Sequence, residues 1–247
     1  MIKSEWLNMI RKPNSRGFTL VEMAIVLVIV GLLVSAFLTP LSAQRDLKDY
    51  AETQKNLVEI KESLIGYAFT HGYLPCPAIS ASNGAEDRTG ATCTDPGTGP
   101  KRVGYLPWAE LGVSKLDSWN HLYRYSVTLA YTNSLAKITL STPADIKIQT
   151  RNSLGSLVDL TNANVIPFVV VSMGKNGLGA TNDDGSLNVD TSATNTDEDT
   201  NVGGTTIFVS RDFSSNTTFG GGEFDDLVTW VPSGVYISRL VQANLLP

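Results

Sequence analysis

A long apolar run directly after a basic N-terminus constrains this chain more than any other feature. The run, Phe18–Leu38, reads FTLVEMAIVLVIVGLLVSAFL and contains one charged residue, Glu22. As a helix, its 21 residues span roughly 31 Å, the thickness of a bilayer core. Residues 1–17 carry four basic side chains against one acidic one. This charge pattern predicts a cytoplasmic N-terminus and export of the rest of the chain.

An ordinary secretory signal is the alternative, but the run is too long and no small-x-small cleavage site closes it. Within the run, Glu22 is the informative residue, because a carboxylate in a membrane helix costs a few kcal/mol. No Lys or Arg follows it within one helical turn. We therefore expect its partner to come from another chain or from a newly made N-terminus.

The sequence RGFTLVE at Arg16–Glu22 resembles the prepilin peptidase site of type IV pilins and pseudopilins. The motif is highly specific when a basic leader precedes it and an apolar helix follows, and the resemblance extends over Arg16–Thr70. It implies a 1–17 leader, cleavage between Gly17 and Phe18, and N-methylation of Phe18. It also implies that Glu22 pairs with the terminal amine of a neighbouring subunit, which the low dielectric of the bilayer favours.

The same resemblance implies a structural subunit of a type IV pilus or a type II secretion pseudopilus. Its partners are then other pilin or pseudopilin subunits, the prepilin peptidase, the inner-membrane assembly platform and the membrane. The implied location is the inner membrane, with a single pass and a periplasmic head, followed by an extracellular pilus or a periplasmic pseudopilus.

The expected domain organisation is a leader, an 18–70 spine helix with a transmembrane part at 18–38, and a 71–247 head. The second half of the helix is amphipathic, and Pro40 is expected to kink it. Its apolar face is formed by Leu47, Tyr50, Leu57, Ile60, Leu64 and Tyr67. We expect the helix to end at His71-Gly72, where glycine supplies the left-handed cap.

The head is predicted to be rich in strands separated by turn residues, which favours a mainly antiparallel sheet. Extended segments are expected at Gly72–Ala78 and Gly104–Ala109. The predicted strands are Leu122–Leu129, Ala136–Leu140, Ile146–Thr150, Val165–Ser172, Thr205–Ser210 and Leu227–Val231. Ser233 is expected to cap a short C-terminal helix. The predicted fold class is α+β, pilin-like, with the spine helix packed on the sheet.

Asp117–Asn120 resembles the Asp-x-Trp-Gly turn that opens the first sheet strand of many pseudopilins and minor pilins. Asn120 stands where glycine is usual, and Asn tolerates the positive φ that such a turn needs.

The only two cysteines are Cys76 and Cys93, and export places both in an oxidising compartment. We predict a disulfide between them, which stabilises the head by about 3 kcal/mol in the chain-entropy model. No histidine lies near enough in sequence to suggest a metal site with them.

The segment Gly174–Gly222 is rich in turn residues and acids. Major pseudopilins carry Ca²⁺ in a loop that starts after a turn similar to Ser172–Gly177. Ca²⁺ takes about six to eight oxygen ligands. The candidate ligands are Asp183 and Asp184, with Asp225 and Asp226 as a second pair. The favoured interpretation is a solvated acidic loop, with Ca²⁺ as the alternative and no other cofactor.

The chain is not expected to be an enzyme or to bind nucleic acid. Its net charge is -5 and it has no basic stripe interleaved with aromatic residues. His71 and His121 are interpreted as structural, since no nucleophile elbow, phosphate loop or zinc motif accompanies them. A tip adhesin or a DNA-uptake minor pilin with a ligand-binding head remains the first alternative, suggested by large loops at Ser80–Lys101 and Gly174–Gly222. A membrane-anchored enzyme is the second.

Overall fold

The computed structural model describes residues 17–95, 99–162 and 164–246, without the side chains of residues 36–41 and 94–100. The chain forms two units, residues 1–47 and 48–247. Helix α1, Leu20–His71, includes residues of both. The helix predicted over residues 18–70 is thus confirmed. The leader up to residue 16 and the side chain of Pro40 lie outside the described residues, so the kink stays a prediction.

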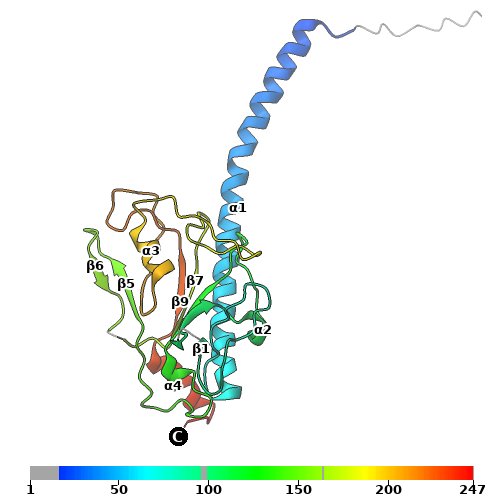
Figure 1. Cartoon of the computed structure of the whole chain (residues 1–247). Coiled ribbons are helices and arrows are strands. Elements are labelled where there is room, and N and C mark those ends of the chain that lie inside the picture. Colours follow the sequence, from blue (N-terminus) through cyan, green and yellow to red (C-terminus); the bar gives the residue numbers. More distant parts are fainter. Residues whose placement is uncertain (1–16, 96–98, 163, 247) are drawn as a thin grey trace, which may run out of the picture. The chain divides into compact units, whose positions relative to one another are not determined.

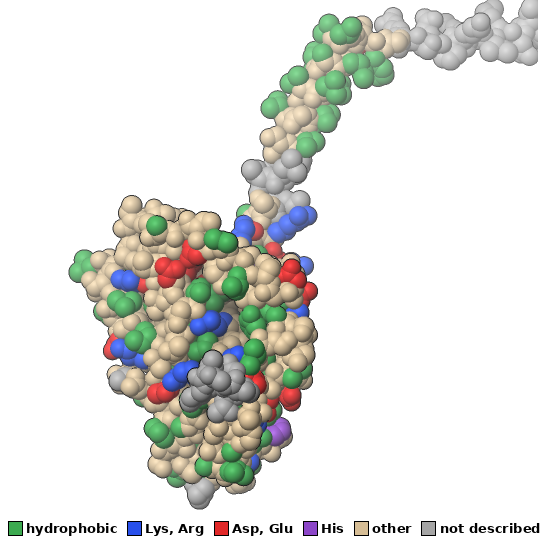
Figure 2. All heavy atoms as spheres, viewed as in Figure 1, with side chains coloured by type: hydrophobic (Ala, Val, Ile, Leu, Met, Phe, Trp, Pro, Cys, Tyr) green, Lys and Arg blue, Asp and Glu red, His purple; other side chains and the backbone are tan. Residues whose placement is uncertain are grey.

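In the N-terminal unit, the described apolar side chains of α1 are exposed, among them Leu20 at 88% and Leu27 at 68%. Figure 2 shows hydrophobic side chains along the visible face of this part of the helix. Among the described residues, no helix has both the length and the hydropathy needed to cross a membrane. The predicted span, Phe18–Leu38, extends into residues 36–38, whose side chains lie outside that description.

The second half of α1 packs on a sheet through residues three or four positions apart. Leu57, Ile60, Leu64 and Ala68 are all buried in one hydrophobic core, as the helical period requires. The predicted face was too long, because Leu47 and Tyr50 are exposed at 71% and 42%, while Tyr67 is half-buried.

The helix ends as predicted. Gly72 has a φ of +78°, and its N–H donates to the carbonyl of Ala68 at 2.8 Å. That left-handed cap satisfies a carbonyl group that the last turn of the helix leaves without a partner.

The main sheet has four antiparallel strands in the order β3-β4-β7-β9. Its strands are β3 Val103–Tyr105, β4 Arg124–Val127, β7 Phe168–Ser172 and β9 Leu227–Trp230. All five residues of β7 are buried, because both faces of the sheet are covered. Phe168 and Val170 face the α1 core, and Val169 and Val171 face a second core.

A second sheet, ordered β6-β5-β8, supplies the other core. Its strands are β5 Lys147–Arg151, β6 Leu157–Asp159 and β8 Ile207–Val209, with β5 parallel to β8. Figure 1 shows β5, β6 and α3, Thr196–Gly203, on the side of the main sheet opposite α1. The predicted α+β class, with a helix on a mainly antiparallel sheet, is therefore confirmed.

The remaining elements are short. They are β1 Thr94–Asp95, β2 Gly99–Pro100, α2 Trp108–Leu111, the 3₁₀ turn Leu129–Tyr131 and α4 Ser233–Gln242. Helix α2 occupies part of the segment Gly104–Ala109, which was expected to be extended. Helix α4 is confirmed, but its N-cap is Pro232, with no side-chain cap hydrogen bond from Ser233.

The predicted strand Ala136–Leu140 is wrong, because local side chains take the hydrogen bonds that a strand needs. Asn133 Oδ1 accepts from the N–H groups of Leu135 and Ala136, and Thr142 Oγ1 accepts from the N–H of Thr139. The other five predicted strands are confirmed in place, each shortened or shifted by a few residues.

Candidate functional site

The N-terminal motif lies at the first turn of α1. Thr19 precedes the helix, and Glu22 lies three residues later. The Thr19 N–H and hydroxyl both donate to Glu22 Oε2 at 2.8 Å, and the Glu22 N–H donates to Thr19 Oγ1 at 3.2 Å. This reciprocal arrangement is a capping box, which satisfies backbone donors at the helix start.

Within the described chain, the carboxylate of Glu22 already accepts hydrogen bonds from Thr19 on the same turn. The expected pairing with the amine of a neighbouring subunit involves a second chain and stays a prediction. Gly17 and Phe18 lie just before the helix, in non-helical backbone. No described residue packs within 4 Å of the position that a Cβ of Gly17 would occupy.

The predicted disulfide is present between Cys76 and Cys93, and both residues are fully buried. The loop between them is also held by Arg88. Its guanidinium donates to Glu86 and to the carbonyls of Ala91 and Thr132. The bridge therefore joins a segment that is already tied to the body of the head.

The turn at Asp117 has the geometry expected of it. Asn120 has a φ of +67°, and Asp117 Oδ1 accepts from the N–H groups of Trp119 and His121, both at 2.9 Å. Ser172 Oγ donates directly to Asp117 Oδ2 at 2.6 Å. The imidazole of His121 contacts the Gly174 carbonyl, so these three side chains do not form a serine–histidine relay.

His121 is buried beside that carboxylate. Burial alone would lower the pKa of His121, but the hydrogen bond and charge of Asp117 together raise it. Its contacts agree with a structural role.

The two predicted pairs of metal ligands are not brought together. Asp183 is exposed and pairs with Lys115, and exposed Asp184 accepts from Ser186 within its own turn. The second pair, Asp225 and Asp226, lies close to a third carboxylate, Glu198 of α3, which was not among the ligands predicted from the sequence.

We call Glu198, Asp225 and Asp226 the acidic cluster. One carboxylate oxygen from each lies within 4.8 Å of the others. Glu198 and Asp226 are buried, at 1% and 7% exposure, so the solvated-loop interpretation of Gly174–Gly222 is wrong for Glu198. No sequence signal distinguishes Glu198 from the other acids of its segment, because only the fold turns it inward.

The acidic cluster is tied to the turn Ser172–Gly177. The Asn176 side-chain amide donates to both Glu198 carboxylate oxygens at 3.0 Å, and its backbone N–H donates to Asp225 Oδ2 at 2.7 Å. The amide of Asn201 donates to Asp226 Oδ2 at 2.8 Å. Asp225 Oδ1 is buried without a partner among the described residues.

Crowding of three carboxylates changes their acidity. Burial, with the charge of Asp225, raises the pKa of Glu198 to about 7 despite its hydrogen bonds. Burial also raises the pKa of Asp225, and burial with the charge of Glu198 raises that of Asp226. Such a cluster either holds protons or binds a cation, and its all-oxygen donors suit a hard divalent metal. It is an acidic cluster that can bind a metal.

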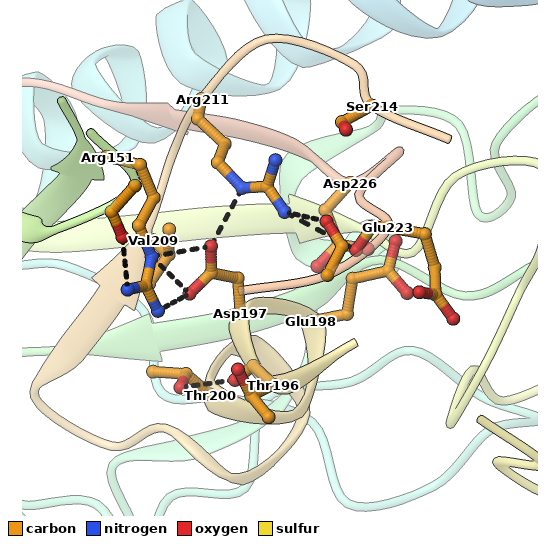
Figure 3. A network of polar contacts seen from close by, with 12 residues as sticks. Arg151, Thr196, Asp197, Glu198, Thr200, Val209, Arg211, Ser214, Glu223 and Asp226 are labelled. Atoms are coloured by element: carbon orange, nitrogen blue, oxygen red, sulfur yellow. Dashed lines mark hydrogen bonds and ion pairs between the residues drawn. The ribbon is translucent and has the colours of Figure 1, made fainter. Parts of the chain in front are cut away.

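A neighbouring polar network fixes the helix that carries Glu198. Figure 3 shows Asp197 between Arg151 and Arg211, with Glu198 directed toward Glu223 and Asp226. Asp197 is 1% exposed and accepts from Arg151 Nη2 and Arg211 Nε, each at 2.7 Å. The two arginines thus anchor α3 to β5 and to the segment after β8.

Comparison with known proteins identifies the N-terminal segment. Comparison of the chain with curated proteins and with solved structures gave no match. A family model described as the prokaryotic N-terminal methylation motif matches residues 12–38. These residues include Gly17, Phe18 and Glu22. The chain therefore carries at residues 12–38 the class III signal peptide of type IV pilins and pseudopilins.

Proposed function

We propose that this protein is a structural subunit of a type IV pilus or a type II secretion pseudopilus. Prepilin peptidase cuts between Gly17 and Phe18 and methylates the new amine of Phe18. The subunit then assembles through α1. The observation that carries the proposal is the methylation motif at residues 12–38, whose part in α1 exposes its apolar side chains from Leu20 to Val34.

Exposed apolar side chains on a helix need an apolar environment. Before assembly, the proposed environment is the inner membrane, with residues 18–38 as a single span and the head in the periplasm. After extraction by the assembly platform, it is the packed α1 helices of other pilin or pseudopilin subunits. The assembled form is an extracellular pilus or a periplasmic pseudopilus.

A catalytic role is not part of the proposal. The hydroxyl of Ser172 donates to Asp117, and the imidazole of His121 is held by a backbone carbonyl. Both groups serve the turn that opens the sheet, which supports a structural role for the head.

Glu22 gains a charged partner in the proposed assembly. In the precursor, the capping box with Thr19 satisfies its carboxylate. In the filament, the terminal amine of a neighbouring subunit supplies an opposite charge, which is worth more than a hydroxyl in a low-dielectric setting.

Two variants and two controls test this proposal in cells that make the assembly machine. Gly17→Val should leave uncut precursor in the membrane, because the added side chain obstructs the scissile backbone, whereas Gly31→Val should be cut. Glu22→Ala should be cut and methylated but absent from sheared filaments, whereas Glu59→Ala on the exposed side of α1 should be incorporated. N-terminal mass spectrometry and quantification of subunit in the two fractions give the readouts.

A shortened product from Gly17→Val, or a mature terminus other than Phe18, would overturn the processing site. Normal filament incorporation of cut Glu22→Ala would refute the assembly role of Glu22.

We propose Ca²⁺ as the cation of the acidic cluster. The donors are carboxylate oxygens, and Asp225 Oδ1 is a buried oxygen with no described partner. Glu198, Asp225 and Asp226 would hold the ion, and Asn176 would orient two of them through its hydrogen bonds. A bound Ca²⁺ would neutralise the crowded charges and fix α3 against the segment before β9.

A further inference from the structure

The head contains a cavity whose lining includes none of the three residues of the acidic cluster. Its volume is about 420 Å³, within the range of small-ligand sites. Its wall includes β3, Arg124 of β4, the segment Gly179–Thr181 and Val202 of α3. Arg124 is on the face of β4 opposite the α1 core, because its neighbour Tyr125 is buried in that core.

Arg124 is the unusual residue of this cavity. It is only partly exposed, and the one hydrogen bond of its side chain among the described residues runs from Nη2 to the Gly204 carbonyl at 3.1 Å. Its Nε is buried with no partner in the described chain. No described carboxylate forms a salt bridge with it. Burial lowers the pKa of Arg124 to about 10, although arginine stays charged at neutral pH.

A desolvated guanidinium without a carboxylate is costly, since buried charges in proteins are normally paired. Two other arginines of the head follow that rule, because the largely buried side chains of Arg151 and Arg211 both form salt bridges with Asp197. Arg124 thus departs from the pattern of its own domain.

The rest of the lining is suited to an anion with an apolar body. The charged side chains that line the cavity are Lys101 and Arg124, and no Asp or Glu is among its described lining residues. This is notable in a chain with 24 acidic residues and a net charge of -5. Leu122, Met173 and Val202 contribute apolar surface.

We infer that this cavity binds a carboxylate attached to a short apolar chain, with Arg124 as the group that recognises the carboxylate. A planar guanidinium donates to a carboxylate through two parallel hydrogen bonds, and the apolar wall covers the chain. The ligand is either a free organic acid or the C-terminal carboxylate of an apolar peptide. The inference does not depend on the proposed role of α1.

Methionine NMR of the full chain in detergent tests this directly. The chain has four methionines, of which Met173 lines the cavity and Met23 lies in the apolar part of α1. With ¹³C-methyl methionine, hexanoate should shift the Met173 resonance in a saturable way and leave Met23 unchanged. Hexanamide, its uncharged analogue, should leave both the Met173 and the Met23 resonances unchanged. Met173→Leu assigns the signal.

Substitution of the arginine separates ligand recognition from a structural role. Arg124→Leu should weaken hexanoate binding by at least about tenfold, the size expected for loss of a charged hydrogen bond, and should unfold at a temperature no lower than the parent. Arg124→Lys should retain part of the affinity. Arg239→Leu, which removes a surface arginine paired with Glu62, should bind as the parent does.

A pair of acetylated Ala-Leu-Leu peptides, one ending in a carboxylate and one in an amide, identifies the source of the ligand. Tighter binding of the peptide acid than of hexanoate assigns a peptide C-terminus, and the reverse assigns a free acid. The inference is overturned if neither acid shifts Met173, if the amides shift it equally, or if Arg124→Leu binds hexanoate unchanged. A marked loss of stability in Arg124→Leu, with no binding to the parent, would make the arginine purely structural.

Discussion

Asp197 shows how one side chain holds several segments of the head. Its carboxylate contacts Arg151 on β5 and Arg211 after β8. The backbone of Gly221 passes so close that a Cβ there would lie 1.9 Å from Asp197 Oδ2. Gly221 also has a φ of +87°, so both space and backbone conformation require glycine. The polar network therefore depends on a residue without a side chain.

We predict that Asp197→Ala lowers the free energy of unfolding by about 3–5 kcal/mol, because two desolvated guanidinium groups lose their partner. Asp199→Asn, on the exposed side of the same helix, is the matched control and should change stability little. Urea unfolding followed by circular dichroism measures both. Equal effects of the two substitutions would contradict the role of the network.

A second ion pair gives a prediction for pH. Arg102 donates to the two Asp145 oxygens at 2.6 and 2.7 Å, and Thr128 Oγ1 donates at 2.6 Å. Burial alone would raise the pKa of Asp145, but these hydrogen bonds lower it below its ordinary 3.8.

A lowered pKa in the folded state means that the unfolded chain binds the proton more tightly. The stability from Asp145 is therefore present above pH 3.8 and lost as the pH falls through the folded-state pKa. We predict that the stability difference between the parent and Asp145→Asn shrinks on acidification below this pH. Parallel denaturant curves from pH 6 to about pH 2.5 measure it. If the difference in free energy of unfolding between the parent and Asp145→Asn stays constant over this pH range, protonation of Asp145 does not weaken its pairing with Arg102.

Residue-level predictions from sequence succeeded where local chemistry decides the outcome. The two cysteines had only each other as partners, and Asn120 was predicted to adopt a positive φ from its place in a turn. Glu198 could not be chosen, because its burial depends on how α3 packs. The sequence likewise gave no sign that Arg124 would face a cavity.

At the scale of elements, the contribution of the disulfide to head stability can be measured separately from membrane insertion through α1. Cys76 and Cys93 close a loop with a sequence separation of 17. We predict that the double variant Cys76→Ser/Cys93→Ser loses about 3 kcal/mol of head stability by the chain-entropy estimate. Membrane insertion should be unaffected, because the loop belongs to the 48–247 unit.

Thermal unfolding and membrane fractionation of that variant give the two readouts, and non-reducing peptide mapping of the parent verifies the bridge. Failure of insertion with a stable head would contradict the prediction. Ser80→Ala within the loop provides a matched control that keeps the bridge.

Helices and strands with long apolar patterns could be predicted from the sequence, whereas short polar elements could not. The 3.6-residue period of apolar residues predicted α1, and the apolar run Val165–Ser172 predicted β7. The segment Ala136–Leu140 alternates like a strand, but its neighbouring Asn and Thr side chains take its backbone hydrogen bonds. Helix α3 was missed because its sequence, TDEDTNVG, has poor helix formers and is held by tertiary contacts.

At the scale of the molecule, the acidic cluster links segments far apart in the chain. We predict that Ca²⁺ at about 100 times its dissociation constant raises the free energy of unfolding by about 2.7 kcal/mol and that EGTA removes the effect. Glu198→Gln should abolish the response, whereas Asp183→Asn, outside the cluster, should keep it. Differential scanning calorimetry measures the shift. Unchanged stability of the parent with Ca²⁺ would contradict a calcium site.

The capping box has a consequence for maturation under the proposed cleavage. Removal of residues 1–17 leaves Thr19 as the second residue of the mature chain, so Thr19 and Glu22 can keep the same hydrogen bonds. The helix then starts at the same place before and after the cut. What changes is electrical, because a cationic amine appears one residue before the cap, at the positive end of the helix dipole. Processing would thus add a positive charge at a preformed helix end, a charge that a neighbouring carboxylate is well placed to neutralise.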